Sequence, residues 1–470
     1  MRRLFFMILR ASLTSQMLKS SSILRLILRA CDGSAGKSAR FGYGGGGSQR
    51  LASVWSFGDN SNGALGISSP LLDAYEPTKV GSLPEDVTTL AAGHYHSLAV
   101  TSAGNVWAWG RNVEGQLGRG TVSPRDTWSK PERVRGLDNV KVKAAYASGV
   151  VSAAIGDDGS LWVWGRSKRG QLGLGKGVTE AIKPTKVEGI AEHEINKVSF
   201  GWGHALALTN SGKLYGWGYA EDGRLGKMEK LVAERIEKEK NMPVNWEPTL
   251  VQELSSMEIV DAVCGLDHSL VLCCDGTVLS CGDNTYGQLG RNAKRLNTVS
   301  IPVNHHPLAV SAGLGHSLLL CRIPSTGESN EATGILSWGW NASSQLGRRG
   351  QGNVPALVDG LEGIRLVSVS AGRVHSLALT SRGEVMAWGS GRNGRLGLGS
   401  STDEAEPAFV DGLEGFEVLQ AIAGFDHSLL LVAPSSTKLH EDGATAVNAL
   451  DANEVQSVKN DGGPKWSGAV

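Results

Sequence analysis

Six histidines recur at one position of a repeated sequence block, and histidine is the side chain most often used for proton transfer and metal binding near neutral pH. Most of them precede a serine, as in AGLGHS, and their positions are His96, His204, His268, His316, His375 and His427. Imidazoles converging on one point would hold a zinc ion, and a His–Ser pair would suit nucleophilic catalysis. Each histidine belongs to a different repeat, however, so a symmetric fold would hold them apart. We therefore interpret the His–Ser pair as a hydrogen-bonding device that ties neighbouring strands.

No other pattern indicates a chemical active site. A Ser-His-Asp order, a phosphate-binding loop and paired carboxylates do not stand out from the repeat, which itself accounts for glycine pairs such as those in GRNGRLGLG. Five cysteines follow residue 50, and they lack the paired spacing of a zinc site: Cys264, Cys273, Cys274, Cys281 and Cys321. The sequence therefore predicts no catalytic residue, no metal site, no cofactor and free thiols.

The histidine blocks belong to a repeat of 50 to 64 residues that occurs seven times. Each copy has a glycine after an aromatic strand, at Gly58, Gly110, Gly165, Gly218, Gly282, Gly339 and Gly389. A Gly-x-Leu-Gly block follows five residues later in six copies, and Ser344 replaces its first glycine in the other. The second copy has Val151 in place of histidine. Recurrent tryptophans predict packing between repeats: Trp55, Trp109, Trp164, Trp217, Trp338 and Trp388.

The repeats predict strands joined by hairpins, as in HSLAVTSAGNVWAWG, where two apolar runs flank a glycine turn. Four strands suit the length of one repeat, and a four-stranded sheet repeated around an axis is a propeller blade. The first copy lacks the His–Ser strand and the last copy lacks the strand that ends in glycine. Pairing residues 427–433 with 52–58 would supply both and remove two exposed edges. We therefore predict an all-β, seven-bladed propeller over residues 51–433, closed by its N- and C-terminal strands.

These motifs resemble the regulator of chromosome condensation repeat family, and the resemblance covers nearly all of residues 51–433. It implies a seven-bladed propeller that binds other macromolecules, and the founding member of the family is a guanine-nucleotide exchange factor for a small GTPase. Plant UV-B photoreceptors form a branch of the family that senses light with clustered tryptophans. Only Trp202 fits their tryptophan position here, where the other copies have His94, Gly149, Leu266, Leu314, Arg373 and Phe425. Photoreception is therefore not expected.

Residues 1–50 differ in chemistry from the repeats. They contain nine basic residues and one acid, Asp32, which leaves 37 basic and 45 acidic residues in 51–470. In SSILRLILRA, Arg25 and Arg29 share one face of a helix whose other face is apolar. This pattern predicts a mitochondrial transit peptide and matrix localisation, with a chloroplast or an unprocessed cytosolic or nuclear extension as alternatives. A glycine-rich joint follows, no stretch approaches a membrane span, and the polar tail 434–470 is expected to be disordered.

Candidate binding residues lie where the repeat is interrupted, because loops carry specificity on a rigid scaffold. Basic residues follow several Leu-Gly blocks and could form one face that binds RNA or an acidic partner: Arg119, Arg125, Lys130, Arg133, Arg135, Arg291, Lys294, Arg295, Arg348 and Arg349. An inserted hairpin tip with Glu328 and Glu331 is a candidate wedge for a GTPase. An inserted segment from Lys227 has a helical apolar stripe, which predicts either a surface helix or a docking helix.

We therefore expect a non-catalytic, monomeric interaction propeller of an organelle-targeted, plant-like member of this family. Its partners would be proteins and organellar RNA-processing machinery, so that it assists RNA processing, splicing or ribosome assembly in mitochondria. The alternative is a guanine-nucleotide exchange factor for a small GTPase.

Overall fold

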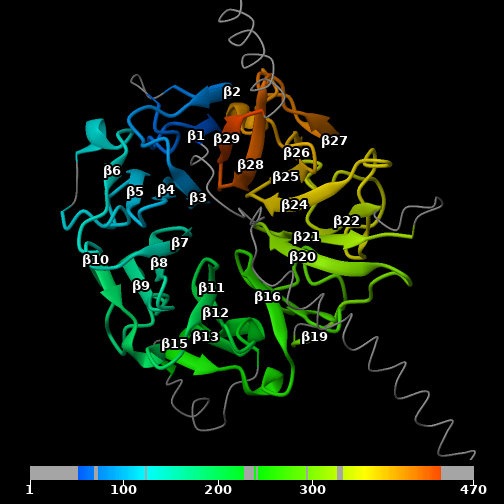
Figure 1. Cartoon of the computed structure of the whole chain (residues 1–470). Coiled ribbons are helices and arrows are strands. Elements are labelled where there is room, and N and C mark those ends of the chain that lie inside the picture. The colour runs from blue at the N-terminus through cyan, green and yellow to red at the C-terminus, as the bar shows by residue number, and fades with distance from the viewer. Residues whose placement is uncertain are drawn as a thin grey trace, which may run out of the picture.

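Seven antiparallel sheets surround a central axis and form a closed ring (Figure 1). The computed structural model describes residues 51–67, 72–121, 124–226, 238–239, 242–292, 295–324 and 332–435. The predicted transit peptide, the helical stripe after Lys227, the tip with Glu328 and Glu331, and nearly all of the predicted tail lie outside these ranges. The seven-bladed propeller predicted from the repeats is confirmed.

Each blade is named here by its number, and strands are given from the centre outward. Blade 1 contains β28 (Phe416–Ala423), β29 (His427–Pro434), β1 (Ser53–Gly58) and β2 (Ala74–Lys79). Blade 2 contains β3 (Val87–Ala92), β4 (His96–Thr101), β5 (Val106–Gly110) and β6 (Glu132–Arg133). Blade 3 contains β7 (Val142–Ala147), β8 (Val151–Gly156), β9 (Leu161–Arg166) and β10 (Glu180–Lys186). Blade 4 contains β11 (Ile195–Phe200), β12 (His204–Thr209), β13 (Leu214–Tyr219), β15 (Met242–Leu250) and β14 (Lys238–Glu239).

The remaining three blades follow the same order. Blade 5 contains β16 (Ile259–Cys264), β17 (His268–Cys273), β18 (Val278–Gly282) and β19 (Asn297–Thr298). Blade 6 contains β20 (His306–Ala312), β21 (His316–Arg322), β22 (Thr333–Gly339) and β23 (Ala356–Leu357). Blade 7 contains β24 (Leu366–Ala371), β25 (His375–Thr380), β26 (Val385–Gly389) and β27 (Glu404–Phe409). The helices of the described residues are single 3-10 turns: Arg125–Thr127, Glu188–Ile190, Glu221–Gly223, Gln252–Leu254 and Arg392–Gly394.

The two ends of the repeat region close the ring in blade 1, as predicted. Strand β1 pairs antiparallel with β29 from Ser53 opposite Val432 to Gly58 opposite His427. The innermost strands β28 and β3 are neighbours as well, so blade 1 contacts blade 2 as other adjacent blades contact each other. The closing pair therefore leaves neither β1 nor β29 with a free edge inside the sheet.

The antiparallel order gives the ring two different faces. In blade 2, His96 at the start of β4 lies opposite Gly110 at the end of β5. The loop before each recurrent histidine and the Gly-x-Leu-Gly block after each third strand therefore emerge together, on what we call the Leu-Gly face. The turns between the second and third strands, such as 102–105 in blade 2, emerge on the opposite hairpin face.

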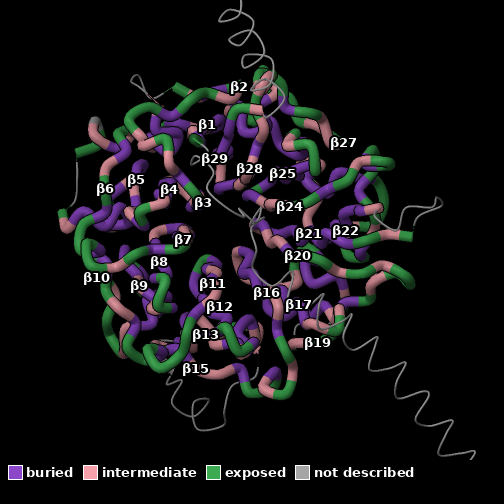
Figure 2. Tube along the Cα trace, viewed as in Figure 1, coloured by how far each residue is buried: buried purple, intermediate pink, exposed green. Residues whose placement is uncertain are grey.

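Apolar clusters fill the spaces between neighbouring blades. Burial is concentrated in the second and third strands of the blades, and the outermost strands are largely exposed (Figure 2). One cluster joins Leu98 and Ala108 of blade 2 to Ala145 and Trp164 of blade 3. Five of the recurrent tryptophans are fully buried in such positions. Trp55 also packs against a cluster between blades 7 and 1, but it is only half-buried, because Phe57 directly before Gly58 takes the position that the other five tryptophans occupy.

A backbone carbonyl of the preceding blade accepts the indole N–H of each of the five buried tryptophans. The carbonyl of Gln116 in blade 2 accepts the indole N–H of Trp164 at 2.8 Å and the hydroxyl of Ser152 at 2.8 Å, both from blade 3. The same carbonyl position accepts from the equivalent tryptophan or serine at the other blade junctions, and in blade 5 the thiol of Cys281 takes the place of the indole. Gly118 must be a glycine, since it has φ +63° and a Cβ there would lie 2.9 Å from the indole nitrogen of Trp164.

The recurrent histidines complete this network between blades rather than within them. His96 Nε2 of blade 2 lies 2.7 Å from Ser152 Oγ of blade 3, and the same contact joins five further pairs of neighbouring blades at 2.9 to 3.1 Å. Because the serine hydroxyl donates its one hydrogen to the carbonyl, the imidazole must donate from Nε2. Burial lowers the pKa of His96 and His316 to about 3 and that of His268 to about 4, so these rings are neutral.

The junction of blades 3 and 4 lacks this contact and has been rebuilt by three coordinated replacements. Val151 replaces the histidine, and Ala205 replaces the serine that would have received its hydrogen bond. Ser148 replaces the glycine before the histidine, where a side chain would collide with the ring: a Cβ on the equivalent Gly93 would lie 2.5 Å from Cε1 of His96. Instead, Ser148 Oγ donates to the carbonyl of Gly201 at 2.8 Å.

Removing strand β29 is expected to open the ring. A chain ending at residue 426 leaves the edge of β1 unpaired, so it should aggregate or unfold, whereas a chain ending at residue 435 keeps the pair and should melt like the full chain. Circular dichroism melting and light scattering of the two truncations test this. Equal melting of both would contradict closure by β29.

The three replacements at the junction of blades 3 and 4 are expected to be interdependent. Val151→His alone forces a ring against Ser148 and should lower the free energy of unfolding by about 1–3 kcal/mol. The triple variant Ser148→Gly, Val151→His, Ala205→Ser should recover that loss, because it rebuilds the contact found at the other junctions. Urea unfolding measures both, and a triple variant no more stable than the single one would refute the coupling.

Candidate interaction face

Part of the predicted basic face is structural. Arg119, Arg291 and Arg348 occupy one repeat position, directly after the Leu-Gly block. Arg119 donates to the carbonyls of Ala108 and Lys130, both at 2.9 Å. Each of the three holds its own loop against the end of the third strand, and desolvation lowers the pKa of each guanidinium.

Arg348 shows why the sequence interpretation needs correction. It was expected in a loop outside the packed positions, yet it is 7% exposed. Its guanidinium donates to the carbonyls of Ser337 at 2.8 Å, Val354 at 2.8 Å and Gln351 at 3.0 Å. The expectation of a free surface charge at Arg348 is therefore wrong.

The other predicted binding residues divide between the described surface and the segments outside it. Arg295 and Arg349 are exposed on loops of the Leu-Gly face, in neighbouring blades 5 and 6. Lys294, Glu328 and Glu331 lie outside the described residues. Arg322 and Thr333, which flank the predicted hairpin tip, pair at the end of β21 and β22 that faces away from Gly339. The basic loops therefore lie on the Leu-Gly face, whereas the strands that lead to the predicted hairpin tip end on the hairpin face.

Aromatic and arginine side chains stack in one row across the Leu-Gly face, and the sequence interpretation did not predict this row. The ring of His94 lies between Phe425, at a centroid distance of 4.1 Å, and Trp202, at 5.6 Å. Arg373 lies over Phe425 at 4.8 Å, and Arg169 lies over Trp202 at 5.6 Å. Cation–π and stacking contacts thus link residues from blades 7, 1, 2, 4 and 3.

Gly149 of blade 3 permits the contact between blades 2 and 4. A Cβ at Gly149 would lie 3.3 Å from Nδ1 of His94 and 3.6 Å from the indole of Trp202. Burial lowers the pKa of His94 to about 3, with His427 and Arg373 adding to the effect, so its ring stays neutral in the stack. Trp202 remains 44% exposed. The row is therefore held rigidly and still presents an indole to a partner.

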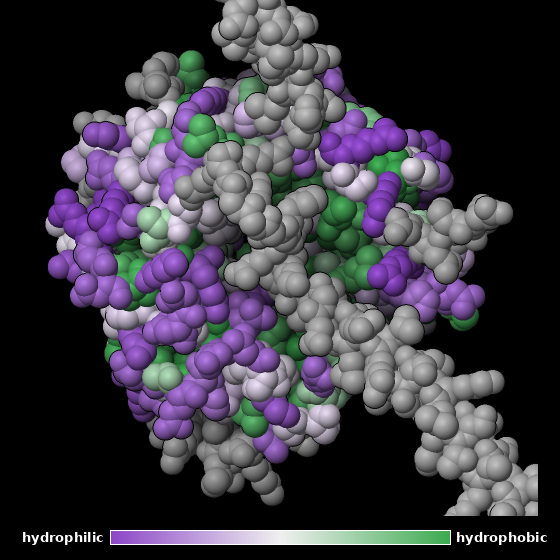
Figure 3. Space-filling view, in the orientation of Figure 1, coloured by the Kyte–Doolittle hydropathy of each residue, from purple (hydrophilic) through white to green (hydrophobic). Residues whose placement is uncertain are grey.

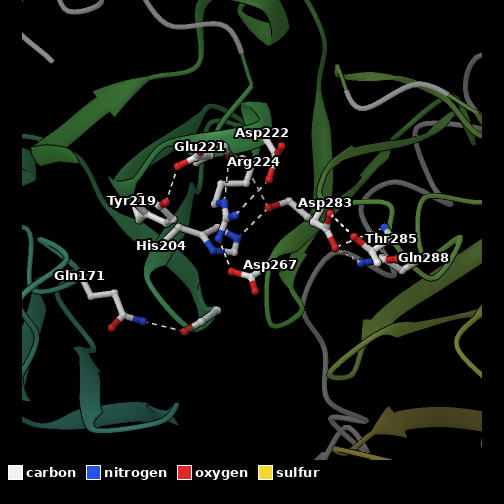
Figure 4. A network of polar contacts seen from close by, with 12 residues as sticks. Gln171, His204, Tyr219, Glu221, Asp222, Arg224, Asp267, Asp283, Thr285 and Gln288 are labelled. Carbon is white, nitrogen blue, oxygen red and sulfur yellow. Dashed lines mark hydrogen bonds and ion pairs between the residues drawn. The ribbon is translucent and has the colours of Figure 1, made fainter. Parts of the chain in front are cut away.

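Two buried ion pairs anchor the same face between blades. Arg224 has a 4% exposed side chain, and it pairs with Asp267 of the next blade and with Asp222 at 3.7 Å (Figure 4). Arg395 pairs with Asp426 at 2.7 Å in the same way. A sequence pattern marks both ion pairs. Each of the two Gly-Arg-Leu-Gly blocks is followed, in the next repeat, by Asp directly before the histidine.

A shallow depression between blades 5 and 6 adds a second aromatic group to the Leu-Gly face. Its lining comprises Tyr286, Gly339, Trp340, Asn341, Gln351, Gly352 and Asn353. Tyr286 and Trp340 stack with centroids 5.2 Å apart and planes 25° apart, and Tyr286 is 48% exposed. In the space-filling view, hydrophobic residues reach the surface in separate patches among hydrophilic ones (Figure 3).

The side chains that the Leu-Gly face exposes suit binding. The imidazoles of the repeat are buried in contacts between blades, and within the described ranges no group of three or more His, Cys, Asp or Glu side chains could hold a metal ion. The five cysteines that the structure describes are free thiols, and burial raises the pKa of Cys264 and Cys281 to about 12. Exposed aromatic and arginine side chains are the residues enriched at macromolecular interfaces. No helix of the described residues could cross a membrane.

Comparison with known proteins agrees with the fold and the repeat. The profile of the RCC1-like domain matches residues 53–430. The chain is 30% identical over 376 residues to the ultraviolet-B receptor UVR8 of Arabidopsis thaliana, covering 77% of this chain and 78% of that protein. It is 31% identical over 350 residues to the human E3 ubiquitin-protein ligase HERC2, covering 73% of this chain, and it spans only 7% of that ligase.

Among solved structures, Prp20p of Saccharomyces cerevisiae superposes with a TM-score of 0.70 at 22% identity, over 86% of this chain and 96% of that one. That structure was described together with the binding of Prp20p to Gsp1p and histones. At this identity the likeness supports the propeller fold.

Arg348 and Arg349 provide a matched test of the corrected basic face. Arg348→Ala removes a buried guanidinium and leaves the carbonyls of Ser337, Gln351 and Val354 without this donor, so it should lower the free energy of unfolding by about 2–4 kcal/mol. Arg349→Ala removes an exposed charge and should change it by at most about 0.5 kcal/mol. Urea unfolding of the two variants gives the comparison, and equal values would refute the structural role of Arg348.

Proposed function

Because the chain belongs to the RCC1-like domain family, we propose that it is a non-catalytic interaction propeller that assists gene expression in mitochondria through RNA processing, splicing or ribosome assembly. The observation that carries the proposal is the Leu-Gly face. On this face, Trp202 and Tyr286 are about half exposed. The recurrent histidines and serines, in contrast, are buried in hydrogen bonds between blades. A rigid ring with exposed aromatic side chains is suited to docking other macromolecules.

The mitochondrial part of the proposal is supported by the chemistry of residues 1–50. Nine basic residues and one acid, with Arg25 and Arg29 on one face of an amphipathic stretch, match an organelle-targeting segment. A matrix protein in that compartment would meet the transcripts and ribosomes of the organelle, and a docking ring would assemble factors on them. Chloroplast, nucleus and cytosol are the competing locations.

A fusion of residues 1–50 to a fluorescent protein is expected to reach mitochondria. Arg25→Glu with Arg29→Glu should abolish import, because the cationic face becomes anionic. Lys37→Glu with Arg40→Glu makes the same charge change outside the amphipathic stretch and should preserve import. Microscopy against a mitochondrial dye reads out all three fusions. Diffuse fluorescence of the unaltered fusion would overturn the localisation, and proximity labelling in intact cells would then name the true partners.

Guanine-nucleotide exchange is the second candidate, because the founding member of the repeat family has that activity. Arg322 and Thr333, which flank the inserted segment, pair at the hairpin-face end of β21 and β22, so a GTPase that engages this segment would approach from the face opposite the basic loops. Glu328→Lys with Glu331→Lys should then impair release of labelled GDP from a small GTPase, whereas Arg295→Glu with Arg349→Glu should not. Accelerated GDP release by the unaltered protein would place this candidate first.

A further inference from the structure

We propose that the stacked pair Tyr286–Trp340, with Gln351 and Asn353 beside it, is a binding site for single-stranded RNA on the Leu-Gly face. The proposal rests on the function proposed above and names the class of ligand. The two rings, together with the amides at their edge, are called the Tyr-Trp platform below.

The Tyr-Trp platform differs from the other aromatic groups of this face in having no arginine of its own. Arginines lie over Tyr95, Trp202, Tyr219 and Phe425 at 4.8 to 5.6 Å. Among the residues that the structure describes, none lies over Tyr286 or Trp340. Among the described residues, the two rings therefore stack only on each other. The ring of Tyr286 is 48% exposed.

The platform is held in place before any ligand arrives. The backbone N–H of Trp340 donates to Gly315 at 2.8 Å, and that of Gly339 donates to Gly352 at 2.6 Å. The N–H of Tyr286 donates to Oε1 of Gln288 at 2.8 Å. Gly315 lies close to both side chains, since a Cβ there would be 3.2 Å from the ring of Tyr286, 3.3 Å from the Cβ of Trp340 and 3.7 Å from its indole. A preordered platform loses little conformational entropy on binding.

The groups around the rings match the parts of an unpaired nucleotide. Nearly parallel rings form a column that a base extends by stacking, which contributes to affinity for any base sequence. The side chains of Gln351 and Asn353 are exposed and make no hydrogen bond with any described residue, so they can bind the edge of a base. Arg349, two residues before Gln351, and Arg295, in the blade 5 loop that carries Tyr286, are exposed cations for phosphates.

The geometry favours RNA over a peptide. A proline-rich segment docks in a groove lined by aromatic side chains, whereas these rings lie 25° from parallel and form a stack. Asp283, in the same loop as Tyr286, accepts hydrogen bonds from Thr285 at 2.8 Å and Gln288 at 2.9 Å; these fix the carboxylate but leave it charged, so phosphates would have to bind away from it. Residues 51–470 contain more acids than bases, so most of the surface would repel RNA. RNA would therefore bind only at a local site that carries its own basic residues.

The test measures fluorescence anisotropy of labelled 20-nucleotide single-stranded RNA, and of a duplex of equal length, with the purified full-length chain. Tyr286→Ala with Trp340→Ala is expected to weaken single-strand binding at least about ten-fold. Tyr75→Ala with Phe409→Ala removes two exposed aromatics from outer strands of other blades and should leave binding within about two-fold. Arg349→Gln should weaken binding and reduce its salt dependence by about one phosphate contact.

If the double aromatic variant unfolds, Gln351→Ala with Asn353→Ala replaces it, because these exposed amides should alter base preference without affecting melting. Equal affinity for duplex and single strand, or wild-type affinity in the platform variants, would overturn the proposal. Binding of an arginine-rich peptide in place of RNA, lost in Trp340→Ala, would overturn it in favour of a protein site. RNA binding without mitochondrial import would refute only the proposed function, and import without RNA binding would refute only this inference.

Discussion

The ring depends on one backbone carbonyl in each Gly-x-Leu-Gly block. At Gln116 that oxygen receives Trp164 and Ser152 from the next blade, and Ser152 in turn receives His96 from the blade of the carbonyl itself. Apolar packing between blades is strong but has no preferred direction. The carbonyl contact supplies direction, because both donors reach it only when neighbouring blades are in register. It also explains the glycines around the block, where the indole approaches too closely for a side chain.

The same contacts determine which parts of the Leu-Gly face are rigid enough to bind. Tyr286 lies two residues before Gln288, whose carbonyl accepts from Ser317 at 2.8 Å and Trp338 at 2.9 Å. The loop that presents Tyr286 is thus fixed by the junction of blades 5 and 6, and Trp340 follows directly after the strand of Trp338. Binding residues placed beside such an anchor keep their geometry without further support. The contacts that hold neighbouring blades together therefore also fix the residues of the proposed binding surface.

The sequence was sufficient for the fold because its repeat fixes both strand order and closure: residues 427–433 and 52–58 supply the halves that the opposite ends lack. It was insufficient for the surface, because charge alone does not distinguish Arg348 from Arg349. Their difference lies in repeat position, since the position of Arg348 recurs as Arg119 and Arg291 in buried contacts with carbonyls. The row through His94 and Trp202 could not be predicted from single repeats, because it spans blade 3 and depends on the missing side chain of Gly149.

Residues that depart from the repeat are of two kinds here: a buried group between two blades, and a partly exposed pair. Val151, Ala205 and Ser148 depart together and meet in space, so each compensates another and the group maintains the junction of blades 3 and 4. Tyr286 and Trp340 also depart together and stack on each other, but Tyr286 is 48% exposed; at its position, before the first residue of the block, the other repeats have Asn, Glu, Arg, Asp or Ser. The loop is tied through the backbone of Tyr286 and through Gln288, and the ring of Tyr286 adds its stack on Trp340 of the neighbouring blade. A half-exposed ring that is stacked on Trp340, with no described arginine over it, leaves one aromatic surface open, and that open surface is the feature that supports a ligand from outside the protein.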